Sequence, residues 1–84
     1  MGEIELNRQK CTVSYDCNGY RLMFKDNELQ IVNPSNEIFT YEINEIADLF
    51  TIQNQLLKDW VADGYKFQVE DIKFFEIVRE MIKI

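Results

Sequence analysis

Apolar and polar residues alternate over residues 11–43 of the chain. An alternation with a period of two places the apolar side chains on one face of a β-sheet. The alternation is interrupted at Asn18-Gly19 and at Asp26-Asn27, and such pairs readily adopt the positive φ angles of a two-residue hairpin turn. The pattern therefore predicts four strands, at about residues 11–17, 20–25, 28–32 and 38–43.

The turns also predict which residues face each other across the sheet. When the two hairpins are centred on these turns, Tyr15 lies opposite Leu22 and Phe24 lies opposite Leu29. A five-residue loop at 33–37 keeps the apolar residues of the fourth strand on the same face. The aromatic residues of this face are interpreted as core: Tyr15, Phe24, Phe39 and Tyr41.

After residue 43 the apolar residues recur with helical spacing. Between residues 45 and 63 they fall on one half of a helical wheel, and Gly64 follows as a stop signal. A second amphipathic helix is predicted at about 70–83, and it begins with the acidic residues Glu70 and Asp71. Gln53 interrupts the apolar face of the first helix, so its amide must either find a hydrogen-bond partner in the core or face water.

These elements predict a single domain of the α+β class. A chain of 84 residues has enough apolar surface for one core. The predicted fold is a four-stranded antiparallel β-meander, about 11–43, covered on one face by two C-terminal amphipathic helices, about 45–63 and 70–83. Ile4 and Leu6 could add an edge strand. Each helix presents about 180° of apolar surface, more than the ~100° that a surface helix needs, so some apolar surface is expected to remain for other contacts.

The chain is acidic, with fifteen Asp and Glu residues, nine Lys and Arg residues and a formal net charge of −6. Duplex DNA and anionic membranes bind clustered basic residues, so direct contact with either is disfavoured and a basic protein partner is favoured. The alternative is that the acidity only keeps the protein soluble. No stretch reaches the ~20 apolar residues that span a bilayer, and the N-terminus is charged where a signal peptide would be apolar. A cytoplasmic protein is therefore expected.

The sequence lacks the residue patterns of common catalytic and cofactor sites. It contains no histidine, which excludes imidazole metal ligands and Ser-His or Cys-His relays. It has no glycine-rich phosphate loop and no EF-hand spacing. Cys11 and Cys17 would lie about 20 Å apart on one strand, beyond the reach of a disulfide, so both are expected to be reduced. We therefore expect a protein that is not an enzyme and that binds no cofactor or metal.

The candidate binding surface lies where the first helix ends and the second begins. It combines acidic with aromatic residues, which suits a basic cleft because aromatic side chains anchor an interface and charges steer the approach. The residues predicted to bind a protein are Asp59, Trp60, Asp63, Tyr65, Glu70 and Asp71. For each acid taken alone, helix capping is the simpler interpretation.

In size, acidity and order of elements, the chain resembles phage-encoded inhibitors of host defence, including anti-CRISPR proteins. Those anti-CRISPR proteins block the DNA-binding groove of a nuclease by presenting carboxylates where phosphates would lie. The many Ile, Asn and Lys residues, whose codons are A/T-rich, favour a source in a low-GC bacterium or in its phages and plasmids. The resemblance is one of general character without shared signature residues, and it implies an inhibitor of a host nucleic-acid-binding protein.

A second hypothesis is a structural or assembly role for the C-terminal helix. The apolar end of this helix could form a homodimer or dock on a larger complex. The residues predicted for self-association are Phe74, Phe75 and Met81. An enzyme that uses carboxylates alone is the least favoured alternative, because the adjacent Glu70 and Asp71 would point about 100° apart on a helix.

Overall fold

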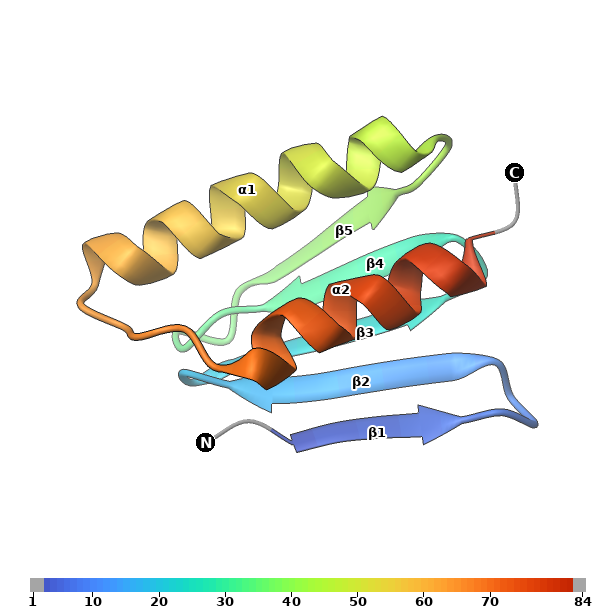
Figure 1. Cartoon of the computed structure of the whole chain (residues 1–84), viewed down its shortest axis with the longest axis horizontal. Helices are drawn as coiled ribbons and strands as arrows, with labels where there is room; N and C mark the ends of the chain where they lie inside the picture. Colours follow the sequence, from blue (N-terminus) through green and yellow to red (C-terminus); the bar gives the residue numbers. More distant parts are fainter. Residues whose placement is uncertain (1–2, 83–84) are drawn as a thin grey trace.

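The computed structural model describes residues 3–82, which form a five-stranded antiparallel sheet with two helices on one face (Figure 1). The strands lie in the sheet in chain order. They are β1 (Glu3–Asn7), β2 (Thr12–Cys17), β3 (Tyr20–Lys25), β4 (Glu28–Val32) and β5 (Ile38–Glu42). The predicted α+β meander is confirmed, and the strand number is corrected from four to five because β1 pairs along β2 as an edge strand.

The two tight hairpins have the register that their turn residues predict. Asn18-Gly19 adopts φ angles of 53° and 78°, and Asp26-Asn27 adopts 51° and 59°. Two consecutive positive φ angles match the right-handed twist of the flanking strands, so the pairing on each side of the turn is fixed locally. The confirmed pairs include Tyr15 with Leu22 and Phe24 with Leu29. The predicted five-residue loop at 33–37 also keeps Phe39 on the same face, opposite Ile31.

The helices are α1 (Ile46–Ala62) and α2 (Val69–Met81), close to the predicted ranges. The predicted end of the second helix at residue 83 lies outside the described residues. In the first turn of each helix, an acidic side chain three residues after the N-cap accepts a backbone N–H, as in a capping box. Within residues 3–82, neither helix combines the length and apolar character needed to cross a membrane.

The core lies between the inner face of the sheet and the two helices. α2 packs closely on β2 and β1, whereas α1 packs beside α2 and approaches no strand as closely (Figure 1). The buried apolar residues of the helices are Leu49, Leu56, Trp60, Phe74, Phe75 and Val78. Other apolar residues of α1 therefore remain outside the core. This agrees with the surplus of apolar surface expected from the sequence.

Gln53 lies at the border of this buried stripe of α1. Its side chain is half-buried and makes no hydrogen bond within residues 3–82. The amide is nevertheless not among the buried polar groups that lack a partner, so it reaches solvent. Of the two alternatives that the sequence left open, the structure supports a place where the helix face meets water.

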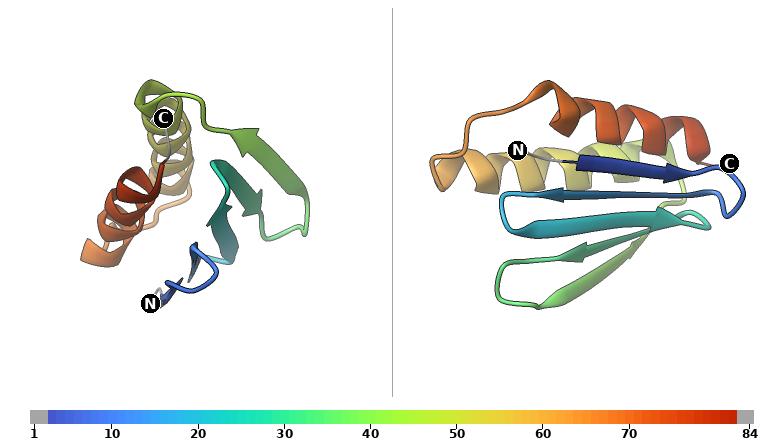
Figure 2. Two further views of the ribbon diagram at one scale, coloured as in Figure 1. Left: turned by 90° about the vertical axis from the view of Figure 1, so that its right-hand side faces the viewer. Right: turned by 90° about the horizontal axis from the view of Figure 1, so that it is seen from below.

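The far edge of the sheet is the least covered part of the inner face. β5 lies away from the helices (Figure 2), and all five of its residues are exposed. Phe39 and Tyr41 share the inner face with buried Leu29 and Ile31, yet they remain 43% and 39% exposed. Their interpretation as core is therefore wrong, because α2 lies over β1 and β2, α1 lies beside it, and the twisted sheet extends beyond both helices.

Candidate functional site

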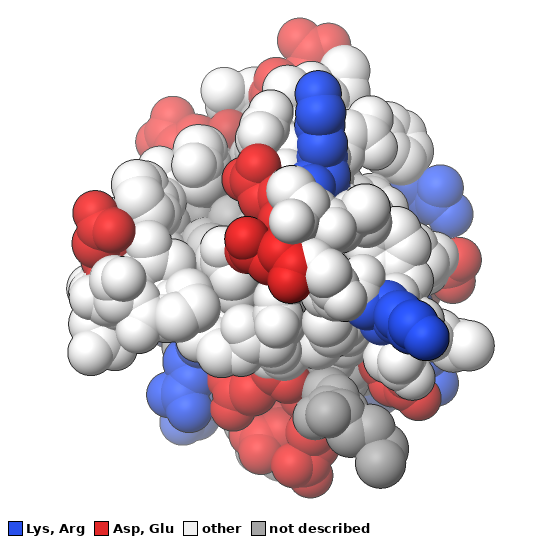
Figure 3. Space-filling view, turned by 90° about the vertical axis from the view of Figure 1, so that its left-hand side faces the viewer, with Lys and Arg blue, Asp and Glu red and all other residues white. Residues whose placement is uncertain are grey.

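The predicted binding surface at the helix junction is exposed only in part. Asp59 and Asp63 lie exposed at the end of α1, and Glu70 is half-buried. Figure 3 shows acidic side chains near the centre of this end of the molecule and a second acidic group at its lower edge. Trp60 and Asp71 are fully buried. They are enclosed by the core of the domain and cannot contact a partner in this fold, which corrects the prediction for these two residues.

Asp71 instead joins α2 to β2 within a buried cluster of polar side chains. Its Oδ1 accepts hydrogen bonds from the hydroxyl of Tyr15 and from the thiol of Cys17, the latter at 3.3 Å. The hydroxyl of Tyr65 lies 3.0 and 2.9 Å from its two carboxylate oxygens, and the N–H of Gln68 donates to Oδ2 at 2.7 Å. A buried carboxylate with this many donors holds the start of α2 against the sheet. The role of this cluster is structural.

Burial and hydrogen bonding raise the pKa of both phenols in the cluster. Burial has the largest effect on the pKa of Tyr15, followed by its hydrogen bonds with Asp71 and with Cys17. Burial also raises the pKa of Tyr65, followed by hydrogen bonds with Cys17 and with Asp71. A phenolate would place a second negative charge beside a buried carboxylate. Both hydroxyls therefore stay protonated and donate.

These raised pKa values predict that the free energy of unfolding falls in alkaline solution. A tyrosine ionises near pH 10 in an unfolded chain, whereas Tyr15 and Tyr65 ionise at higher pH in the folded protein. Their contribution is fully present below about pH 10 and is lost as the pH rises above it. Urea denaturation at neutral and at increasingly alkaline pH measures the decline, and Tyr15→Phe should make it shallower. A free energy that does not change through the alkaline range would contradict this prediction.

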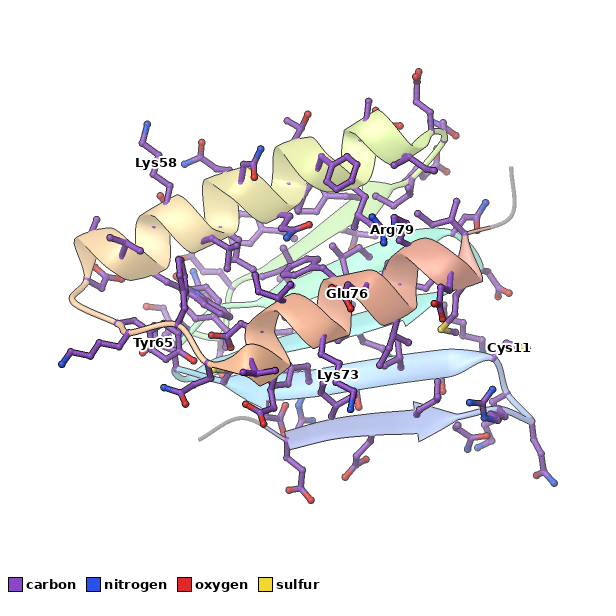
Figure 4. The ribbon with its side chains drawn as sticks, viewed as in Figure 1. Cys11, Lys58, Tyr65, Lys73, Glu76 and Arg79 are labelled. Carbon is purple, nitrogen blue, oxygen red and sulfur yellow. The ribbon has the colours of Figure 1, made fainter. Side chains whose placement is uncertain are left out.

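Trp60 fills the space beneath the exposed end of α1. Its ring centroid lies 5.4 Å from that of Tyr20 and 5.2 Å from that of Tyr65, which lies in the loop between the helices (Figure 4). Trp60 Nε1 is the one buried side-chain polar atom without a hydrogen-bond partner within the described residues. Burial raises the pKa of Tyr20, and the charges of Asp63 and Asp59 raise it further. Trp60 thus packs inside the domain, whereas the carboxylates of Asp59 and Asp63 remain exposed at the surface.

A groove of about 450 Å³ lies between α1 and β3, β4 and β5. Its lining is mainly apolar, and Phe39 and Tyr41 form its wall on β5. The remaining residues that matter here are Tyr20, Ile31, Ile52 and Asp59. Larger hollows, of about 500 and 670 Å³, lie at the turn between β1 and β2 and beside the turn between β2 and β3, but their linings are more polar than apolar. The groove beside β5 is therefore the better candidate for a binding site.

Two acidic residues lie at one end of this groove. Asp59 lines it, and Asp63 follows one turn later at the end of α1. This end carries the negative pole of the helix dipole and has no basic residue in its last turn. On the outer face of the sheet, behind the groove, Glu28 of β4 lies directly opposite Glu42 of β5, although like charges in this arrangement repel. Negative charge is thus present at one end of the groove, on Asp59 and Asp63, and on the outer face of the sheet at Glu42.

Sequence reasoning missed this groove because it assigned Phe39 and Tyr41 to the core. The available signal was the fifth strand at Ile4 and Leu6, which widens the sheet beyond the reach of two helices. The sequence does predict a binding role for Asp59, which lines the groove, but as part of the surface at the helix junction.

The residues predicted for self-association lie within the domain. Phe74 and Phe75 are buried with their ring centroids 5.2 Å apart, and Met81 is half-buried against the core. They are on the side of α2 that faces the sheet, so this fold leaves the two phenylalanine side chains unavailable to a second chain. The exposed apolar residues of α2 are instead at its start, where Val69 is 79% and Ile72 is 40% exposed.

Comparisons with protein-family models, with curated proteins and with solved structures found no match for this chain. In the part of the chain that the structure describes, no group of three or more cysteine or acidic side chains could hold a metal ion. Cys11 and Cys17 are both free, the first exposed and the second buried. The groove and its charges are therefore the features of this chain that bear on its function.

Proposed function

We propose that this protein is a small, non-enzymatic binding module that holds a basic segment of another protein in the groove between α1 and β5. One observation carries the proposal. Phe39 and Tyr41 lie on the face of the sheet that forms the core, yet both remain about two-fifths exposed, and they line the same groove as Asp59. An apolar surface bordered by charges of one sign suits a partner of complementary shape and opposite charge.

The charges at one end of the groove and on the outer face of β5 support a basic partner. Asp59 and Asp63 lie at the unfavourable end of a helix dipole, and Glu42 lies opposite another carboxylate. Each arrangement costs the isolated domain a little stability. Lysine or arginine side chains of a partner would convert these repulsions into attractions, and the charges would also accelerate association.

We further propose that the partner is a nucleic-acid-binding protein. The chain would inhibit it by offering Asp59, Asp63 and Glu42 to basic residues that otherwise hold phosphates, as phage-encoded inhibitors of host defence do. It would then act in the cytoplasm, beside its target. Asp71 has no part in this form of the proposal, because its carboxylate is occupied inside the fold.

The assembly alternative receives less support. A homodimer through Phe74 and Phe75 would require both side chains to leave the core. Two copies that each carry a net charge of −6 also repel each other unless their contact pairs the charges.

Capture from a lysate of the source organism, at low and at high salt, tests the proposal. We expect the wild-type protein to retain a basic protein at low salt and to release it at high salt, because screening weakens exposed charge pairs. The double variant Asp59→Lys/Asp63→Lys should not retain it. The matched control is Glu76→Lys/Glu80→Lys, which makes the same change of charge on the exposed side of α2, where Figure 4 shows Glu76.

The control separates a local contact from a general effect of charge. Retention by the control but not by Asp59→Lys/Asp63→Lys supports the proposal. Equal loss in both double variants would mean that only net charge matters, and the absence of any retained basic protein would contradict the proposal.

The same double variant is expected to unfold less readily than the wild type. Asp59 lies in the last turn of α1 and Asp63 is its C-cap. Replacing a carboxylate by an ammonium group at this end changes an unfavourable interaction with the helix dipole into a favourable one, worth about 0.5 kcal/mol for each residue. Asp59 would lose only the exposed hydrogen bond from Gln55 Nε2, at 3.0 Å. Thermal denaturation followed by circular dichroism measures the change. A clear loss of stability would mean that the two carboxylates serve the fold rather than a partner.

A further inference from the structure

We infer that the partner segment binds as an extended strand added to the free edge of β5, with a basic side chain opposite Glu42 and apolar side chains directed into the groove. The inference rests on the proposed function, because it specifies how the groove is occupied. Strand addition is a common way for a sheet edge to bind peptides, in which backbone hydrogen bonds supply affinity and alternate side chains supply specificity.

The free backbone groups of β5 can be assigned from its pairing with β4. Just outside the strand, the N–H of Asn33 donates to Glu37 at 3.0 Å and the N–H of Ile43 donates to Asn27 at 2.7 Å. In an antiparallel ladder the hydrogen-bonded pairs recur at every second residue. Phe39 and Tyr41 therefore bond to β4. The backbone N–H and C=O groups that point to the free edge belong to Ile38, Thr40 and Glu42.

This edge lacks the features that usually protect an edge strand. Proteins block such edges with lysine, proline, bulges or a covering element. β5 contains no lysine or proline, its pairing with β4 is regular over all five residues, and all five residues are exposed. The opposite edge strand, β1, carries two charges, on Glu3 and Glu5, whereas β5 carries one, on Glu42. β5 is thus the edge open to a sixth strand.

The side chains along β5 define the chemistry of that strand. On the outer face, Lys25 lies opposite Glu28 and Glu28 lies opposite Glu42. The residue of an added strand that faces Glu42 would therefore lie next to a carboxylate. A lysine or arginine there would make the favourable cross-strand pair that Glu42 lacks. On the inner face, the next positions adjoin Phe39 and Tyr41 at the wall of the groove. The expected segment alternates basic and apolar residues.

A second copy of the chain matches this edge less well. If two β5 strands paired antiparallel about Thr40, Glu42 would face Ile38 of the second copy and would still lack a cation. The two chains would also bring together net charges of −6 each. Charge complementarity therefore favours a basic segment as the occupant.

Amide hydrogen exchange measured by NMR tests the inference, with a synthetic peptide of alternating valine and lysine as the probe. When the free peptide concentration is about nine times its Kd, the amides of Ile38, Thr40 and Glu42 should exchange about tenfold more slowly, because exchange then requires peptide release. The amides of Phe39 and Tyr41 already bond to β4 and should change less. A peptide of alternating valine and glutamate serves as the charge control and should give no protection.

Two variants at one position separate strand addition from other modes of binding. Thr40→Pro removes the central donor of the free edge, and an edge strand tolerates proline where its N–H faces solvent. It should abolish the protection, whereas Thr40→Ala should retain it. Retained binding in Thr40→Pro would overturn the inference, provided that the NMR spectrum shows the variant to be folded. Glu42→Lys should reverse the preference between the two peptides.

The remaining outcomes distinguish this inference from the proposed function. Peptide-induced shifts at Phe39 and Tyr41 without protection of the three edge amides would overturn strand addition and leave the groove as a binding surface. Binding of neither peptide would also overturn it, while the lysate capture would still decide the proposed function. Protection that rises with protein concentration in the absence of peptide would show that the edge of β5 binds a second copy of the chain, and it would overturn the basic segment as the occupant.

Discussion

Asp71→Ala is expected to lower the free energy of unfolding by about 4 kcal/mol, because a buried donor that loses its acceptor costs about 1–3 kcal/mol and the substitution leaves more than one such donor. The substitution deprives the hydroxyls of Tyr15 and Tyr65, the thiol of Cys17 and the N–H of Gln68 of their common acceptor. The buried donors, on Tyr15 and Cys17, cannot recover a partner from water. A loss of this size is a large fraction of the stability of a small domain.

The matched control for this prediction is Asp48→Ala in α1. Asp48 occupies the same position of the first turn and accepts the N–H groups of Asn44 and Glu45 at 2.9 and 3.1 Å, but these bonds are exposed. Its removal should cost about 1 kcal/mol, the usual value for a helix cap. Urea denaturation of both variants gives the comparison. Equal losses would mean that the cluster around Asp71 contributes no more than a cap does.

Phe74→Ala is expected to lower the free energy of unfolding by about 3–5 kcal/mol, the range for removing a buried aromatic side chain. Phe74 is fully buried, and its ring stacks on Tyr15 with centroids 5.6 Å apart. Phe39→Ala should cost much less, because Phe39 is 43% exposed and borders an open groove. Denaturation curves of the two variants under identical conditions measure the contrast.

The same pair of variants separates the core from an interface. If Phe74 served self-association instead, Phe74→Ala would leave the monomer intact and would change only the dependence of molecular mass on concentration. Light scattering at several concentrations, combined with the denaturation curves, distinguishes the two roles. A stable Phe74→Ala monomer, or a Phe39→Ala variant that loses as much stability as Phe74→Ala, would contradict this assignment.

The hairpins could be predicted in detail because their determinants are local. Asn18-Gly19 and Asp26-Asn27 lie between the residues that they pair, and positive φ at both turn positions leaves one register for each hairpin. The helices followed from periodicity and from the acidic residues of their first turns. In each case, the residues that decide the structure are close together in the sequence.

The candidate site could not be predicted in the same way, because it depends on contacts between residues that are far apart in the sequence. The capping role of Asp71 was foreseeable, but its burial depends on Tyr15 and Cys17, which approach it only when α2 packs on β2. The exposure of Phe39 likewise depends on where α1 lies beside α2. Periodicity predicts which side of a strand is apolar, but it does not predict how far a helix layer extends over a sheet.

The decisive measurement is a selection of random peptides for binding to the immobilised protein. If the groove between α1 and β5 holds basic segments, the enriched peptides should alternate Lys or Arg with apolar residues. They should lose binding at high salt and to Phe39→Ala, but not to the control Val69→Ala, which removes an exposed apolar side chain at the start of α2. Enriched peptides without basic residues, or with equal affinity for Phe39→Ala and the wild type, would contradict a binding site at the groove.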